Sequence, residues 1–196
     1  MSTLTETTRT IETESLTTVA GGDTKIEFDS EFYRILNDNN IEINIAGDAM
    51  LGDNDDSLNL PITGGEITDD SVSEWMGMAE LQHRGSGLSF THDGVTVELD
   101  DLTINTGTGD IYGRPKVMGS DMPIFDSKPV LFTLAETADL SAGLTTASTD
   151  ENMLLDEAGI ILSDDAAQLL NEAFGLHTTL DGDTYVGTAT VTVSTG

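Results

Sequence analysis

The side chains that could act as nucleophiles or general bases are scarce in this sequence. It contains three histidines and no cysteine, which excludes a thiolate nucleophile and Cys-ligated metal sites. Ser86 lies in a Gly-Ser-Gly triplet, which lacks the G-x-S-x-G spacing of a hydrolase nucleophile elbow. Phosphate-binding loops of the G-x-x-x-x-G-K-[ST] and G-x-G-x-x-G types do not occur either. The sequence therefore predicts a protein that is not an enzyme.

Carboxylates, by contrast, are abundant, and clustered Asp and Asn oxygens are the natural ligands of calcium. Asp53, Asp55 and Asp56 begin like an EF-hand loop, but Leu58 stands where glycine is required and Gly64 where the bidentate glutamate is required. An EF-hand is thereby excluded. A looser calcium site at Asp53, Asp55 and Asp56 stays open, beside the alternative of a solvated acidic loop. Two further residues offer the same choice: Asp181 and Asp183.

The net charge limits the partners of the protein. Its 196 residues include 36 acidic and seven basic side chains, for a formal charge of −29. Nucleic acids and anionic lipid surfaces attract basic faces, so we expect neither as a partner. No run approaches the roughly 20 apolar residues that span a bilayer, so no membrane insertion is expected.

High charge of one sign favours solubility and suits a saline or calcium-rich exterior. We therefore expect an extracellular or cell-surface location. The first residues lack the basic and apolar segments of a cleavable signal, so a cytoplasmic location stays open as the alternative.

Short segments in which apolar and polar residues alternate predict the strands that position the candidate functional residues. Ile41, Ile43 and Ile45 alternate with polar residues, as in a half-buried strand. His92-Asp93-Gly94 separates two such segments and is typical of a tight hairpin. Strands at this spacing with Gly-rich turns predict a mainly β fold, an antiparallel β-sandwich or barrel-like sheet.

One short α-helix is expected late in the chain, at about residues 163–175. Ser163 is placed as its N-cap and Gly175 as its C-terminal stop. A closing strand follows, with four residues expected on one face: Tyr185, Ala189, Val191 and Val193.

The N-terminal part differs in composition from the rest. Residues 1–24 are Thr-rich, and we expect them to form an extension to a single β domain at residues 25–196. Low hydrophobicity is typical of a solvated leader. Thr is β-branched, however, so this segment could also pair as an edge strand or as a strand exchanged between molecules.

Several runs resemble HtaA-type haem-binding domains and related bacterial surface-anchored β domains. The runs at residues 60–65, 83–88 and 95–99 carry this similarity. The helix-and-strand close at residues 161–171 and 187–191, with its G-T-A-x-V strand, is similar to that of the family. The resemblance covers roughly residues 25–193 and implies a predominantly β extracellular domain.

The resemblance also implies a haem site. In HtaA-type domains a Tyr from an early aromatic segment ligates the haem iron, supported by a His in a G-H-x-G-like loop. Tyr33 and His83 could match these two residues. This chain departs from the pattern, because Gln82 replaces the glycine before the histidine and no Trp precedes the Tyr33 segment. The sole tryptophan, Trp75, falls elsewhere.

Together these observations favour a non-enzymatic, exported or surface-associated β protein that acts in structure or interaction. Its expected partner is a second copy of itself, with residues 2–20 adding a strand to the next molecule's sheet edge. The alternative is HtaA-like haem capture through Tyr33 and His83. Calcium at Asp53, Asp55 and Asp56 is compatible with either. A DNA mimic is disfavoured because the acidic residues fall mostly in turns.

Overall fold

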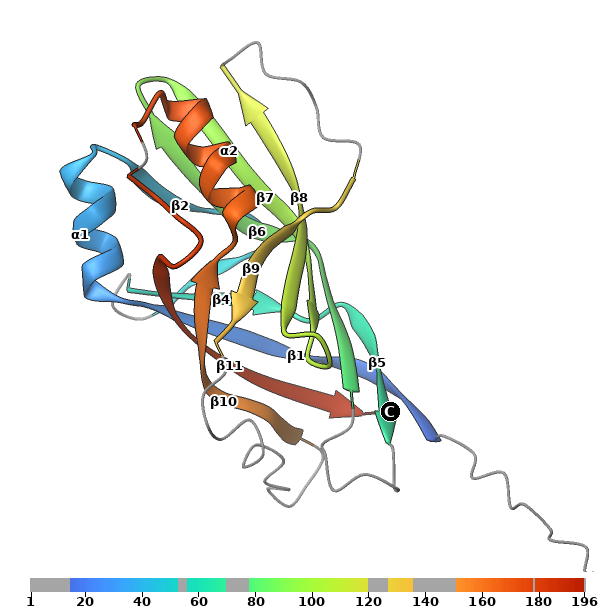
Figure 1. Ribbon diagram of the computed structural model, residues 1–196. Coiled ribbons are helices and arrows are strands. Elements are labelled where there is room, and N and C mark those ends of the chain that lie inside the picture. Colours follow the sequence, from blue (N-terminus) through green and yellow to red (C-terminus); the bar gives the residue numbers. More distant parts are fainter. Residues whose placement is uncertain are drawn as a thin grey trace, which may run out of the picture.

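An antiparallel sheet that closes on itself forms the body of the protein (Figure 1). The computed structural model describes residues 15–52, 56–69, 78–119, 127–135, 151–177 and 179–195. Within this part, each strand pairs with the next in the ring and β11 pairs back with β1. The ring consists of β1 (Ser15–Phe28), β5 (Gly64–Asp69), β6 (Met78–His92), β7 (Val95–Asn105), β8 (Asp110–Met118), β9 (Val130–Leu134), β10 (Glu151–Leu162) and β11 (Tyr185–Thr195). The predicted antiparallel, barrel-like β fold is confirmed.

Three short strands interrupt the ring at one end. β4 (Ser57–Pro61) leads into β5, and both pair with β1 in one continuous register. β5 also pairs with the first part of β6, whereas β2 (Glu42–Gly47) pairs with its second part. β3 (Met50–Leu51) pairs with β4. Among the described residues no ladder joins β2 to β3. The barrel therefore has a seam between these two strands, and this seam positions the candidate site.

Two helices lie at the seam end of the barrel (Figure 1). α2 (Asp164–Phe174) has Ser163 as N-cap and Gly175 as C-cap, with a left-handed φ of 65° at the glycine. The late helix is thus confirmed. α1 (Ser30–Asp38) buries Phe32 and Leu36, which are one helical turn apart. Neither helix of the described part is long and apolar enough to cross a membrane.

β1 includes residues that the sequence assigns to an extension. Residues 15–24 pair with β5, β4 and β11 of the same chain, and Val19 and Thr24 are buried. The expected boundary between residues 24 and 25 therefore falls inside a strand of the barrel. Residues 1–14 lie outside the described residues.

The hairpin and the closing strand follow the sequence pattern closely. Asp93 and Gly94 have positive φ values of 48° and 85°, as a two-residue hairpin turn requires. Ala189, Val191 and Val193 of β11 are buried, as expected. The expectation that Tyr185 shares their face is wrong, because its side chain is 42% exposed. The strand is irregular between them, with Gly187 at φ 153°.

Candidate functional site

Tyr33 lies on α1 with its ring packed against β1. The ring is half-buried, and its centroid is 5.6 Å from that of Phe28 in an edge-to-face arrangement. Phe28 also stacks on Phe32, which is fully buried. Such aromatic pairs stabilise beyond the area they bury. The phenol of Tyr33 is thereby held beside the end of β1.

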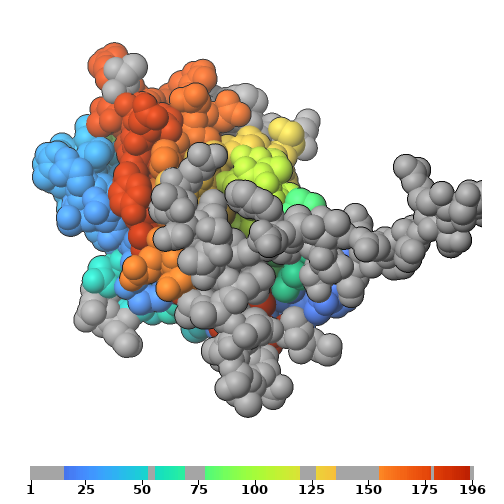
Figure 2. All heavy atoms as spheres, turned by 60° about the horizontal axis from the view of Figure 1, so that its bottom comes forward, coloured from blue at the N-terminus to red at the C-terminus, as the bar shows by residue number. Residues whose placement is uncertain are grey.

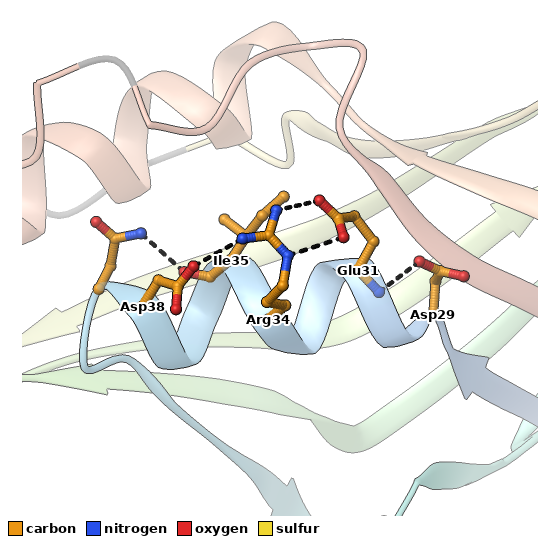
Figure 3. Close-up of polar contacts among 6 residues, drawn as sticks. Asp29, Glu31, Arg34, Ile35 and Asp38 are labelled. Atoms are coloured by element: carbon orange, nitrogen blue, oxygen red, sulfur yellow. Dashed lines mark hydrogen bonds and ion pairs between the residues drawn. The ribbon is translucent and has the colours of Figure 1, made fainter.

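Polar contacts cap α1 and link side chains along its exposed face (Figure 3). The Asp29 carboxylate caps the helix by accepting a hydrogen bond of 2.8 Å from the Glu31 N–H. The Arg34 guanidinium lies between the carboxylates of Glu31 and Asp38 and donates to both. Its hydrogen bond and charge lower the pKa of the Glu31 carboxyl. Exposed pairs of this kind add little stability, and the inward face of α1 is set by the buried Phe32 and Leu36.

The base of α1 is tied to the last strand of the barrel. The Asp29 N–H donates to the Val186 carbonyl at 2.9 Å. Figure 2 shows α1, in blue, beside the red C-terminal part of the chain. Tyr33 is thus carried by an element that is fixed at its first turn.

An apolar slit opens at the barrel seam next to Tyr33. It encloses about 120 Å³. Its lining comes from β1, α1, β2, β3, β4 and β6: Phe28, Tyr33, Ile43, Asn44, Ile45, Leu51, Leu58 and Leu88. Ile45 and Leu51 are 39% and 51% exposed, and the neighbouring Met50 is 54% exposed. Large apolar side chains therefore face solvent on both sides of the seam.

The slit combines mostly apolar lining residues with two that carry polar groups, Tyr33 and Asn44. This chemistry suits a flat apolar ligand that carries a centre able to accept a phenolate oxygen. The enclosed volume is below the roughly 300 Å³ at which ligand pockets begin. A large ligand therefore requires β2 and β3 to move apart.

His83 lies in a different environment from Tyr33. Its side chain is fully buried, and its Nε2 lies 2.8 Å from the Thr24 Oγ1. Its Nδ1 has no hydrogen-bond partner of good geometry. Burial lowers the pKa of the imidazole to about 4, and the adjacent Leu102 backbone opposes this shift only in part. The ring is therefore neutral near pH 7.

The structure does not bring Tyr33 and His83 together. Thr24, the partner of His83, and Phe28, the partner of Tyr33, are four residues apart on β1, which corresponds to about 13 Å along a strand. The interior cavity lined by Thr24 and Phe28 encloses only about 20 Å³. Tyr33 therefore lines the slit at the seam, whereas the His83 side chain is buried inside the barrel.

The expected calcium residues are described only in part. Asp53 and Asp55 lie outside the described residues, as does Trp75. Asp56 is exposed, and its carbonyl accepts a hydrogen bond of 3.0 Å from the Phe28 N–H. No group of three metal-ligating side chains occurs in the part of the chain that the structure describes.

The second acidic loop forms a turn. The Asp181 carboxylate accepts hydrogen bonds from the Thr184 hydroxyl at 2.8 Å and from the Asp183 N–H at 3.2 Å. The Asp181 side chain is thus used in shaping this loop.

The sequence points to Tyr33 through the family resemblance but gives no sign of the slit around it. The alternation of Ile43 and Ile45 predicts a strand, yet it does not indicate that β2 has an edge unpaired within the described residues. The edge arises from the strand pairing, in which β4 pairs with β1 while β2 pairs with β6. The sequence pattern does not contain this information.

Comparisons with known proteins bear on this fold. No protein family and no curated protein matches the chain. A solved structure of the C-terminal domain of HtaA from Corynebacterium glutamicum superposes with a TM-score of 0.62 and 14% sequence identity, over 93% of this chain and 100% of that one. The N-terminal domain of the same protein gives a TM-score of 0.55 and 14% identity, over 91% and 98%.

The chain has an HtaA-like fold. The structural resemblance expected from the sequence is confirmed by both superpositions. At 14% identity the likeness concerns the arrangement of the backbone. The function depends on the side chains at the seam rather than on the fold alone.

Proposed function

We propose that the protein is a non-enzymatic haem-binding protein, with Tyr33 as the ligand of the haem iron. The observation that carries this proposal is the apolar slit at the barrel seam, which has the Tyr33 side chain in its wall. The HtaA-like fold supports it, because the resemblance implies a tyrosine ligand from an early aromatic segment. A location outside the cell or on its surface is part of the same proposal.

The residues of the slit fit the chemistry of haem. A phenolate oxygen is an established axial ligand of haem iron. Ile43, Ile45, Leu51 and Leu58 offer the apolar contact that a porphyrin face needs. When bound, haem supplies the iron to which the Tyr33 oxygen coordinates. His83 takes no part in this site, because Thr24 engages it inside the barrel.

The seam gives the slit a way to widen. β3 has only two residues and pairs only through Met50 and Leu51 with β4. Moving β3 away from β2 breaks no strand–strand hydrogen bond within the described residues. The connection between β2 and β3 is short, however, and its Asp48 and Ala49 N–H groups donate to the Gly85 and Ala46 carbonyls at 2.8 and 3.4 Å. The slit can therefore widen only away from this connection, at the cost of apolar contacts that the ligand replaces.

Titration with hemin tests the proposal. We expect the wild-type protein to give a saturable Soret band at micromolar hemin, and Tyr33→Phe to weaken binding at least tenfold. Phenylalanine keeps the ring against Phe28 and removes only the oxygen. Tyr185→Phe, on β11, is the matched control, and we expect it to bind like the wild type.

A second variant addresses the slit itself. Ile45→Asp places a charge on its exposed rim, and we expect it to weaken hemin binding without unfolding the barrel. The proposal is overturned if wild type shows no saturable band, or if Tyr33→Phe and Tyr185→Phe bind hemin equally.

Action in structure or self-assembly stays a separate prediction. The favouring observation is that β2 and β3 have free edges within the described residues, to which a strand of another molecule could pair. Residues 15–20 already pair within their own chain, so the exchanged segment would have to come from residues 2–14.

A further inference from the structure

Positive charge is distributed unevenly in this acidic protein. Four of the six described cations pair with carboxylates: Lys25, Arg34, Arg114 and Lys116. The other two, Arg84 and Lys128, have no ion pair with any described residue. The Arg84 Nη2 donates to the Gln82 Oε1 at 2.8 Å, and the Lys128 Nζ donates to the Asp101 carbonyl at 3.1 Å. Both partners are uncharged acceptors.

These two cations line the same pocket. It encloses about 260 Å³, and its lining residues are Glu80, Gln82, Arg84, Thr103, Tyr112 and Lys128. Glu80, Gln82 and Arg84 alternate along β6, while Gln82, Thr103 and Tyr112 are register partners across β6, β7 and β8. Lys128 comes from the segment before β9. Three strands and a loop thus converge on one concavity of the sheet's polar face.

A pair of bulges supplies the geometry at the pocket's edge. The register of β6 shifts between His83 and Gly87, and that of β7 and β8 shifts between Asp100 and Thr103. Asp101 has a positive φ of 52°, and its carboxylate accepts from the Gly85 N–H at 3.0 Å. Bulges re-aim the side chains beside them. Here they lie directly beside Arg84, whose side chain is exposed on β6.

The donors in the pocket are only partly used. A guanidinium carries five N–H donors and an ammonium three, and each of these side chains donates one hydrogen bond to the described residues. Thr103 adds a hydroxyl. The Asp101 carboxylate lies close enough to Lys128 for the two charges to interact, and its pKa is lowered first by the Gly85 N–H and then by Arg114 and Lys128. Asp101 itself forms its ion pair with Arg114 at 3.2 Å.

We propose that this pocket binds a small oxyanion, the carboxylate or phosphate group of a small molecule, between Arg84 and Lys128. Charge-assisted hydrogen bonds from guanidinium and ammonium groups are the strong ones for such anions. The net charge of −29 does not prevent this, because salt screens charges beyond about 8 Å at physiological ionic strength. Glu80 favours an oxyanion that also carries a hydroxyl donor.

A titration followed by backbone amide NMR tests the proposal. Sodium chloride is replaced by sodium citrate, or by sodium phosphate, at constant ionic strength. We expect saturable shifts at residues 80–84, 103 and 112 with at least one of these probes in the millimolar range. Binding of citrate alone would assign a hydroxycarboxylate, and binding of phosphate alone would assign a phosphate group.

Variants separate a built site from general ion effects. Arg84→Gln and Lys128→Gln should each weaken binding, and the double variant should weaken it at least tenfold. Arg34→Gln, whose cation is already paired on α1, should bind like the wild type. Equal thermal unfolding of the variants would show that they remain folded. The proposal is overturned if neither probe gives a saturable shift, or if a folded double variant binds like the wild type.

Discussion

At the scale of single residues, the structure buries an imidazole inside a largely apolar barrel. His83 is fully buried, its ring touches the Thr24 hydroxyl, and the core of the barrel is mostly aliphatic and aromatic. A charged imidazole in such a place loses its hydration without gaining a counter-charge. This explains both the low pKa of His83 and its unsuitability as an accessible iron ligand.

The same burial predicts an acid-sensitive fold. The folded pKa of His83 is about 4 against an ordinary value of 6.5, so the unfolded chain takes up the proton more readily. The stabilisation of the fold that goes with neutral His83 is therefore complete above about pH 6.5. About 3 kcal/mol of folding free energy is lost as the pH falls toward 4. We expect the free energy of unfolding in urea to depend less on pH over this range in His83→Gln than in the wild type.

The control for this prediction is His177→Gln, in an exposed position after α2. Its unfolding free energy should fall with acid as steeply as that of the wild type. The carboxylates contribute equally to all three proteins, so the difference between curves isolates His83. Parallel curves for wild type and His83→Gln would contradict the assignment.

At the scale of elements, strong local patterns were predictable and long-range ones were not. The hairpin at Asp93, the helix after Ser163 and the core of β11 each follow from turn, capping or alternation rules. α1 is only nine residues long, which is too short to give a clear helical repeat in the sequence. The sequence pattern does not predict β1 clearly, because the buried face of this strand has few apolar residues and includes the polar Thr24.

The two candidate sites also differ in how far the sequence alone predicts them. Tyr33 is detectable from a family resemblance, because it lies in a local aromatic segment. The pocket at Arg84 and Lys128 joins residues that are 44 positions apart, and only the strand register and the bulges place them together. The order of residues along the chain does not indicate that these two side chains lie close together.

The cap of α2 offers a test of how this helix is attached. The Ser163 hydroxyl accepts from the Ala166 N–H at 3.1 Å and donates to the Val130 carbonyl at 2.6 Å, so it joins the helix to β9. We expect Ser163→Ala to lower the free energy of unfolding by about 1–2 kcal/mol. Chemical denaturation measures this change.

Ser30→Ala is the matched control for that experiment. Ser30 is an exposed first residue of α1, whose cap is Asp29. We expect it to change the free energy of unfolding by less than about 0.5 kcal/mol. Equal losses in both variants would show that Ser163 does not tie α2 to the barrel.

At the scale of the whole molecule, the prediction of self-association can be tested without damaging the barrel. Deletion of residues 2–14 leaves β1 complete from Ser15. If this segment donates a strand to another copy, light scattering after size exclusion should show oligomers for the full chain and monomers for the folded deletion variant. A full chain that is monomeric, with and without millimolar calcium, would contradict self-assembly.

The pairing of β1 with β11 has a consequence for how the protein is made. The ladder runs from Val19 opposite Thr195 to Phe28 opposite Gly187, so the barrel closes across more than 150 residues of chain. Such distant contacts make folding slow. A nascent polypeptide on the ribosome therefore cannot complete the barrel until residues near 195 have emerged. Until then β1 lacks one of its neighbours, and the backbone groups along that edge stay open to pairing with another strand.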